Sequence, residues 1–156
     1  MLAVPSALGI RRTISRLHDG NRYPEQYWST GTMATIELTI DNFEQTINDN
    51  DTVFVDFWAE WCGPCRQFAP VFQAAAEQHP DIVFGKVDAD SQQELAGHFN
   101  IRSIPTLMAI RDNVVLFSQP GALPAHAFDD LIGQIKDIDM DDVRRQIAEE
   151  QAARSD

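Results

Sequence analysis

The chain has 156 residues, 44% of them hydrophobic, so it can bury one core and is expected to form a single domain. Its formal net charge of −12 disfavours contact with the phosphate backbone of nucleic acids. It also contains no apolar run of about 18 residues, the length needed to cross a bilayer. Composition therefore argues against nucleic-acid binding and membrane insertion.

Charge is unevenly distributed along the chain. Residues 1–32 carry four arginines against Asp19 and Glu25, a net charge of +2, which leaves −14 for the remaining residues. The opening MLAVPSALGIRR places its positive charges after the apolar stretch, the reverse of a secretory signal, so we expect a cytoplasmic protein. A mitochondrial-type leader, an unstructured tail and a start codon assigned too early all fit this segment. We treat 1–32 as a basic, disordered extension outside a fold that begins at Met33.

The chain then alternates between strand and helix patterns. TIELT predicts a short strand over 35–39, and DNFEQTIND predicts a short helix over 41–49 that begins at Asp41. TVFVDFWA, over 52–59, is apolar on both faces, as a central strand covered on both sides would be. Helices are therefore expected on both faces of the sheet.

The pattern continues with a helix over 62–78, which Pro70 should kink. A strand over 81–89 follows, and then a helix whose first turn has Ser91 and Glu94 at capping-box spacing. Two strands joined by a hairpin loop and a final helix complete the order, over 106–110, 114–119 and from about 125. This order predicts an α/β fold with a central mixed sheet flanked by helices.

The two cysteines, Cys62 and Cys65, stand in the motif WCGPC. As a structural staple they are badly placed, because a four-residue ring stabilises by only about 1.9 kcal/mol in the chain-entropy model. A structural zinc site normally takes four Cys or His ligands, and no histidine stands beside a second cysteine motif. A zinc cluster shared between two chains stays open, but the pattern favours thiol redox chemistry.

Cys62 falls where the central strand ends and the next helix begins. A sulfur there faces unpaired backbone N–H groups and the positive end of the helix dipole, which favours thiolate over thiol. Cys65 lies one helical turn later, within reach of the first sulfur but more covered. We therefore expect Cys62 to attack a partner's disulfide and Cys65 to resolve the mixed disulfide. Pro64 suits the first turn, where its missing N–H would have had no partner.

The segments VDFWAEWCGPC, SIPT and PGA, in this order and at these separations, resemble the thioredoxins over about residues 34–135. The resemblance implies a thioredoxin fold over 33–136, acting as a protein-disulfide reductase and electron carrier of the bacterial type. It implies oxidised proteins as substrates, recharging by an NADPH-dependent thioredoxin reductase, a monomer, and neither cofactor nor metal. The competing hypothesis is a thioredoxin fold used as a binding or chaperone-like module, with incidental thiols.

The resemblance assigns roles to two charged residues. Asp56 lies in mid-strand on the face shared by Phe54 and Trp58, where burial should raise the pKa of its carboxyl. In thioredoxins this position exchanges protons with the resolving cysteine. The alternative is a strand-end Asp that is hydrogen-bonded to backbone. Lys86 matches the charge partner of that Asp, although the residues alone indicate a solvated edge position.

The resemblance also predicts a substrate-binding rim opposite the cysteines. In similar proteins the proline at position 105 is cis, and the backbone of the preceding residue, here Ile104, pairs with the extended substrate chain. The other predicted rim residues are Trp61, Gly63, Pro64 and Gly121. Pro120 departs from the β-branched residue common in thioredoxins, which leaves substrate preference near this loop open.

Residues 137–156 extend beyond the usual length of the family. DMDDVRRQIAEEQAAR predicts an acidic helix capped by Asp139. Two i,i+4 ion pairs are expected along it, Asp141–Arg145 and Glu150–Arg154. Its apolar stripe is thin, which favours a solvated continuation of the preceding helix over a docking or dimer helix.

Overall fold

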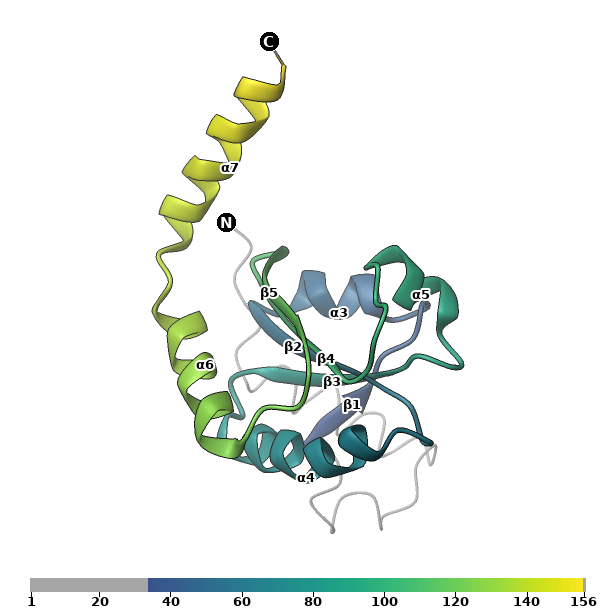
Figure 1. The fold of residues 1–156 in the computed structure, drawn as a ribbon. Coiled ribbons are helices and arrows are strands. Elements are labelled where there is room, and N and C mark those ends of the chain that lie inside the picture. The colour runs from purple at the N-terminus through teal and green to yellow at the C-terminus, as the bar shows by residue number, and fades with distance from the viewer. Residues whose placement is uncertain (1–33, 156) are drawn as a thin grey trace, which may run out of the picture.

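The computed structural model describes residues 34–155. Its centre is a five-stranded sheet in the order β1-β3-β2-β4-β5 (Figure 1). β3 pairs in parallel with β1 and β2, whereas β4 pairs antiparallel with both β2 and β5. The elements in chain order are β1 (Thr35–Glu37), α3 (Phe43–Asp49), β2 (Thr52–Trp58), α4 (Gly63–Gln78), β3 (Val83–Asp88), α5 (Gln93–His98), β4 (Thr106–Arg111), β5 (Val114–Pro120), α6 (Ala125–Asp137) and α7 (Met140–Arg154). The predicted mixed sheet is confirmed.

Helices cover both faces of the sheet, as the apolar pattern of the central strand predicted. α4 and α6 lie on one face, and α3 and α5 on the other (Figure 1). Side chains of β2 alternate between the two, because successive residues of a strand point to opposite faces. Phe54 packs with α4 and α6, whereas Val53, Val55 and Phe57 pack with α3 and α5.

Five phenylalanines fix α4 against the sheet. Their ring centroids lie between 5.4 and 6.2 Å apart in the pairs that touch, and each residue is at most 1% exposed. They are Phe54, Phe68, Phe72, Phe84 and Phe128. Each such ring pair adds about 0.5–1.5 kcal/mol beyond its buried area. Pro70 lies inside α4, yet the helix continues to Gln78, so this cluster holds one unbroken element.

The start of α3 differs from its prediction. The helix begins at Phe43 rather than at Asp41. The turn before it is closed by Asn42, whose Oδ1 accepts the backbone N–H of Thr39 at 2.8 Å. Asn42 rather than Asp41 therefore occupies the position before the helix, and its side chain bonds backward in the chain.

The predicted capping box of α5 is also wrong. The helix begins at Gln93, and none of the side chains that the structure describes caps it. Ser91 Oγ instead donates to the carbonyl oxygen of Asp88 at 3.4 Å, and the Asp88 carboxylate accepts the backbone N–H groups of Asp90 and Ser91. An Asp at the end of β3 thus competes for the groups that a capping box would use.

The C-terminal extension forms a separate helix and does not continue α6. α6 ends at Asp137, Ile138 has an extended backbone, and Asp139 caps α7. Its Oδ1 accepts the backbone N–H groups of Asp141 and Asp142. The predicted cap is confirmed, whereas the predicted continuous helix is wrong.

Ion pairs along α7 are displaced from the predicted ones. Arg145 pairs with Asp142 rather than with Asp141, and Asp141 pairs with Arg144. Both pairs join residues three apart instead of four. The second predicted pair, Glu150–Arg154, is not formed within the described residues.

One guanidinium group ties the junction of α6 and α7 to the sheet. Arg111, at the end of β4, donates through Nη1 to three carbonyl oxygens, those of Ile135, Lys136 and Ile138, at 2.9, 3.1 and 2.8 Å. Carbonyl groups at a helix end lack partners within the helix, so this contact satisfies them. Arg144 of α7 also pairs with Asp112 in the β4–β5 hairpin, at 3.0 Å. These contacts join the base of α7 to the hairpin and to the end of β4.

We predict that Gly85→Ala lowers the free energy of unfolding by about 1–3 kcal/mol, because the core is already filled there. A Cβ at Gly85 would lie 2.2 Å from Cδ1 of Leu38, whose side chain is fully buried. Urea denaturation measures the loss. Gly97→Ala in α5 is the matched control, since its Cβ would meet no atom of residues 34–155 within 4 Å, and it should leave stability unchanged or slightly higher. Equal losses in both variants would contradict this explanation.

Candidate active site

β2 leads into the site and α4 leads out of it. β2 ends at Trp58 and α4 begins at Gly63, so Cys62 occupies the capping position immediately before the helix. Its Sγ accepts the backbone N–H of Cys65 at 3.2 Å, and Pro64 lies in the first turn. A helix start thus directs an N–H group at this sulfur, as the sequence predicted, and stabilises negative charge on it once the pair is reduced.

Cys62 and Cys65 form a disulfide, with Cα atoms 5.2 Å apart. Ala59 packs with the pair, and Trp58 and Ile104 lie against it. The two cysteines are 4% and 3% exposed, so the predicted difference in coverage is wrong for this oxidised state. What distinguishes the two sulfurs is hydrogen bonding, because the helix N–H is directed at Cys62 Sγ.

The loop before β4 faces the disulfide. The Ile104–Pro105 bond is cis, which confirms the geometry implied by the resemblance. The carbonyl oxygen of Ile104 lies 3.7 Å from Cys62 Sγ. Gly121, with φ of 109°, donates its N–H to the carbonyl oxygen of Pro105 at 2.8 Å, a backbone conformation that favours glycine. The fold therefore brings these predicted rim residues to one place.

Asp56 lies in the core on the face of β2 that α4 covers. It is fully buried, and neither carboxylate oxygen has a hydrogen-bond partner among the described residues. Burial raises the pKa of this carboxyl to about 7, and the positive charge of Lys86 opposes part of the rise. Its place in the middle of β2, without partners, overturns the alternative of a strand-end Asp bonded to backbone.

Lys86 is the direct cross-strand neighbour of Asp56 in the parallel pair of β2 and β3. Its Nζ lies 4.8 Å from the centroid of the Trp58 ring, within range of a cation–π contact. β3 lies between β1 and β2, so the interpretation of Lys86 as a solvated edge residue is wrong. Lys86 acts on Asp56 through its nearby charge and not through a direct ion pair.

A groove of about 540 Å³ runs beside the disulfide. Trp61 and Asp90 line one part of it, and residues 102–104 line another. Trp61 is 68% exposed, and its indole Nε1 donates to Asp90 Oδ2 at 2.8 Å, which holds the ring in place. Of the other predicted rim residues, Gly63 is half-buried and Pro64 exposed.

The groove residues Asp90 and Arg102 were not predicted from the sequence. A signal for Asp90 was available, because it follows β3 by two residues and the carboxyl ends of neighbouring parallel strands meet at one edge of the sheet. No comparable signal exists for Arg102, whose position depends on the path of the α5–β4 loop.

Within residues 34–155, His, Cys, Asp and Glu side chains do not gather in a group of three that could hold a metal ion. None of the described helices combines the length and apolar character needed to cross a bilayer.

Known proteins similar to this chain include thioredoxins. The thioredoxin family model matches residues 34–134. A putative thioredoxin 2 from Streptomyces coelicolor is 60% identical over 119 residues, covering 76% of this chain and 89% of that protein. A thioredoxin from Alicyclobacillus acidocaldarius is 47% identical over 79 residues, covering 50% of this chain and 75% of that protein.

Solved structures agree. The N21Q mutant of thioredoxin from Halobacterium salinarum gives a TM-score of 0.63 at 31% identity, covering 68% of this chain and 95% of that one. A thioredoxin from Plasmodium falciparum gives a TM-score of 0.60 at 34% identity, covering 64% of this chain and 97% of that one. The chain therefore belongs to the thioredoxin family of disulfide oxidoreductases, with a thioredoxin fold and with Cys62 and Cys65 as its redox-active pair.

Proposed function

We propose that Cys62 attacks the disulfides of protein substrates and that Cys65 releases the products. The observation that carries this assignment is the hydrogen bond from the Cys65 N–H to Cys62 Sγ at the start of α4. It stabilises a thiolate on the Cys62 sulfur, and the thiolate is the form that attacks a disulfide. Neither Gly63 nor Pro64, between the cysteines, carries a charge that would stabilise the thiolate further and make the disulfide more oxidising.

The proposed reaction passes through one mixed disulfide. The Cys62 thiolate attacks a sulfur of the substrate disulfide, whose S–S bond breaks, and the released substrate sulfur takes up a proton. Cys65 then loses its proton and attacks the Cys62 sulfur. The Cys62–Cys65 disulfide forms and the second substrate sulfur leaves as a thiol. In total, two electrons and two protons pass to the substrate.

Asp56 is proposed to take the proton from Cys65 in the second step. A carboxyl with a pKa near 7 can both accept and release a proton at neutral pH. It lies on the face of the sheet covered by α4, the helix that contains Cys65. Lys86 is proposed to keep that pKa from rising further, because its positive charge favours the ionised carboxylate.

Substrate binding is proposed to use the rim around the disulfide. The backbone of Ile104 would pair with an extended substrate segment, a mode that gives affinity with little sequence selectivity. Exposed Trp61 offers a rigid apolar surface beside it. The remaining contacts are assigned to Gly63, Pro64, Pro105 and Gly121.

We assign the catalytic unit to residues 33–136, with 1–32 and 137–156 as extensions. The family match ends at residue 134, close to the end of α6, which supports this boundary. An NADPH-dependent thioredoxin reductase is proposed to reduce the Cys62–Cys65 disulfide, so that the protein acts as an electron carrier. We also propose that it acts as a monomer. A reducing compartment such as the cytoplasm suits this role, because a dithiol stays reduced there.

We predict that Cys65→Ser accumulates mixed disulfides, because the variant attacks substrates and cannot release them. Cys62→Ser should trap at least about tenfold less, since its remaining thiol lacks the N–H contact that stabilises a thiolate. Non-reducing gels of both variants after incubation with cell extract, followed by mass spectrometry of the adducts, measure this. Equal trapping would show that the assignment of roles is wrong, and no trapping by either variant would favour a binding module.

Asp56→Asn should slow release from the mixed disulfide at least about tenfold, as expected when a general base is lost. Attack by Cys62 should stay within about twofold of wild type, because Asp56 is assigned to the second step. Stopped-flow measurements with a disulfide peptide separate the two steps. Asp129→Asn, an exposed carboxylate on α6, is the matched control. A variant impaired only in the first step would exclude the proposed proton transfer.

The same variant should change how stability depends on pH. Because the Asp56 pKa is raised from 3.8 to about 7, the folded protein keeps a proton that the unfolded chain loses as pH rises above 4. Raising pH from 4 through 7 therefore lowers the free energy of unfolding of wild type. The free energy of unfolding of Asp56→Asn, relative to that of wild type, should therefore rise across this window by up to about 4 kcal/mol. Urea denaturation of the oxidised proteins at pH 4, 6 and 8 measures this, and a constant difference would refute it.

A further inference from the structure

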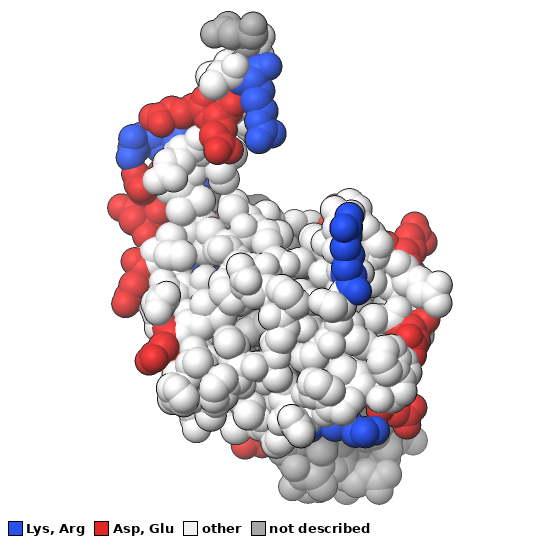
Figure 2. Space-filling model, viewed as in Figure 1, with Lys and Arg blue, Asp and Glu red and all other residues white. Residues whose placement is uncertain are grey.

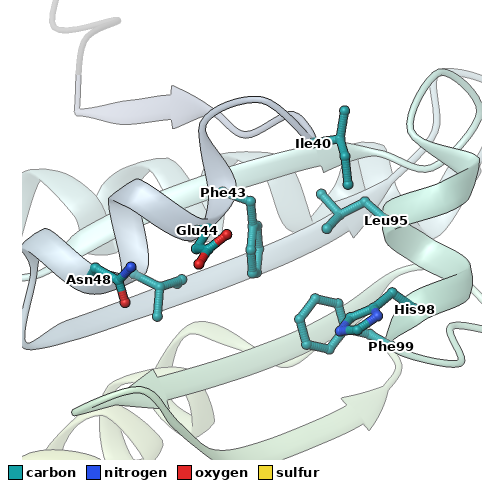
Figure 3. Close-up of a pocket in the computed structure, with 8 residues that line it drawn as sticks. Ile40, Phe43, Glu44, Asn48, Leu95, His98 and Phe99 are labelled. Carbon is teal, nitrogen blue, oxygen red and sulfur yellow. The ribbon is translucent and has the colours of Figure 1, made fainter.

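A second groove lies on the face of the sheet opposite α4. It measures about 320 Å³ and runs between α3 and α5, where Ile40, Phe43 and Leu95 converge (Figure 3). The rings of Phe43 and Phe99 form its floor, with centroids 5.2 Å apart. It shares no lining residue with the groove beside the disulfide, and no step of the reaction uses it.

The lining indicates what kind of group fits. Ile40 is 50% exposed, although it borders the buried side chains of Phe43 and Leu95. Small-molecule sites usually measure about 300–1,000 Å³ and are mostly apolar, with a few precisely placed polar groups. This groove lies at the lower end of that range. Its polar lining residues are Glu44, Asn48 and His98, and the other five are apolar. Its size and chemistry suit a few aliphatic side chains of a peptide segment.

The charge of α3 and α5 indicates which kind of peptide segment the groove would bind. Residues 34–51 and 88–99, which contain α3 and α5, include eight Asp or Glu and neither Lys nor Arg. Figure 2 shows acidic side chains along the side of the molecule that α5 occupies. Of these acidic residues Glu44 lines the groove itself. The negative charge of the two helices attracts a basic segment and repels an acidic one. The expected occupant therefore combines aliphatic side chains with arginine or lysine.

We propose that this groove docks residues 8–17 of the same chain, LGIRRTISRL. Ile10, Ile14 and Leu17 recur at the i, i+4, i+7 spacing by which a helix presents anchors to a groove. Three arginines, at positions 11, 12 and 16, stand among these anchors, and the chain contains no acidic residue before Asp19. The segment thus combines apolar side chains that match the groove lining with positive charge that matches the acidic residues of α3 and α5.

The groove is within reach of this segment. Ile40 follows Ala34 by six residues, so the two lie at most about 20–22 Å apart. The 16 residues between Leu17 and Ala34 would span about 20–24 Å as a flexible linker. A linker matched to the distance gives an effective concentration in the millimolar range, so weak contacts suffice for docking.

The proposal goes beyond the disulfide chemistry, and its test does not use activity. The full chain would be prepared with labelled Ile and Leu methyl groups for NMR. Nuclear Overhauser effects are expected between methyl groups of Ile14 or Leu17 and those of Ile40 or Leu95. The absence of such effects, or contacts of the segment with another surface, would overturn the proposal. In a mixture of labelled and unlabelled chains, effects that prove intermolecular would show a second copy in the groove and would also overturn it.

Matched charge variants of the full chain test the role of the negative charge at the groove. Glu44→Lys in the groove lining should weaken the methyl contacts at least about threefold, and 0.5 M salt should weaken them as well. Asp129→Lys makes the same charge change on α6, across the sheet, and should leave the contacts unchanged. Ile40→Asp should abolish them, and because Ile40 is half exposed this change spares the core. Equal weakening by the Glu44 and Asp129 variants would attribute the effect to net charge and refute docking in this groove.

Discussion

The chemistry of this protein depends on one sulfur that caps one helix. Cys62 Sγ receives the backbone N–H of Cys65, and this is possible only because β2 stops at Trp58 and α4 starts at Gly63. The phenylalanine cluster holds α4 in that place against the sheet, and the loop around Ile104 covers the disulfide from the other side. Packing far from the sulfur atoms thus determines the electrostatics at them.

The buried carboxylate of Asp56 is the clearest exception to the rules of a stable core. It lacks any hydrogen-bond partner among the described residues, and Lys86 is occupied with the ring of Trp58. A core of this size can tolerate such a group, because many apolar contacts compensate for one poor site. Departures from local rules that persist in a well-packed fold tend to coincide with function, and here the departure lies beneath the helix that contains the second cysteine.

Local patterns predicted the element order and the position of Cys62, since both follow from a strand at 52–58 that is apolar on both faces and from the helical composition after it. Features that depend on distant segments were not predictable. Asn42 and the carboxylate of Asp88 displace the expected helix starts by bonding to nearby backbone. Part of the coverage of the cysteines comes from Ile104, about 40 residues away in the chain. The break between α6 and α7 is accompanied by the contact of Arg111 with carbonyl groups, which no local pattern reveals.

Arg111 has a mechanical consequence for the whole molecule. Because it anchors the end of α6, and Arg144 pairs with the β4–β5 hairpin, α7 is a rod fixed at its base. Its 15 residues extend about 22 Å, and it leaves the body on the side away from the β2–α4 loop (Figure 1). A tether attached to the far end of this rod would immobilise the protein and leave the disulfide accessible to large substrates.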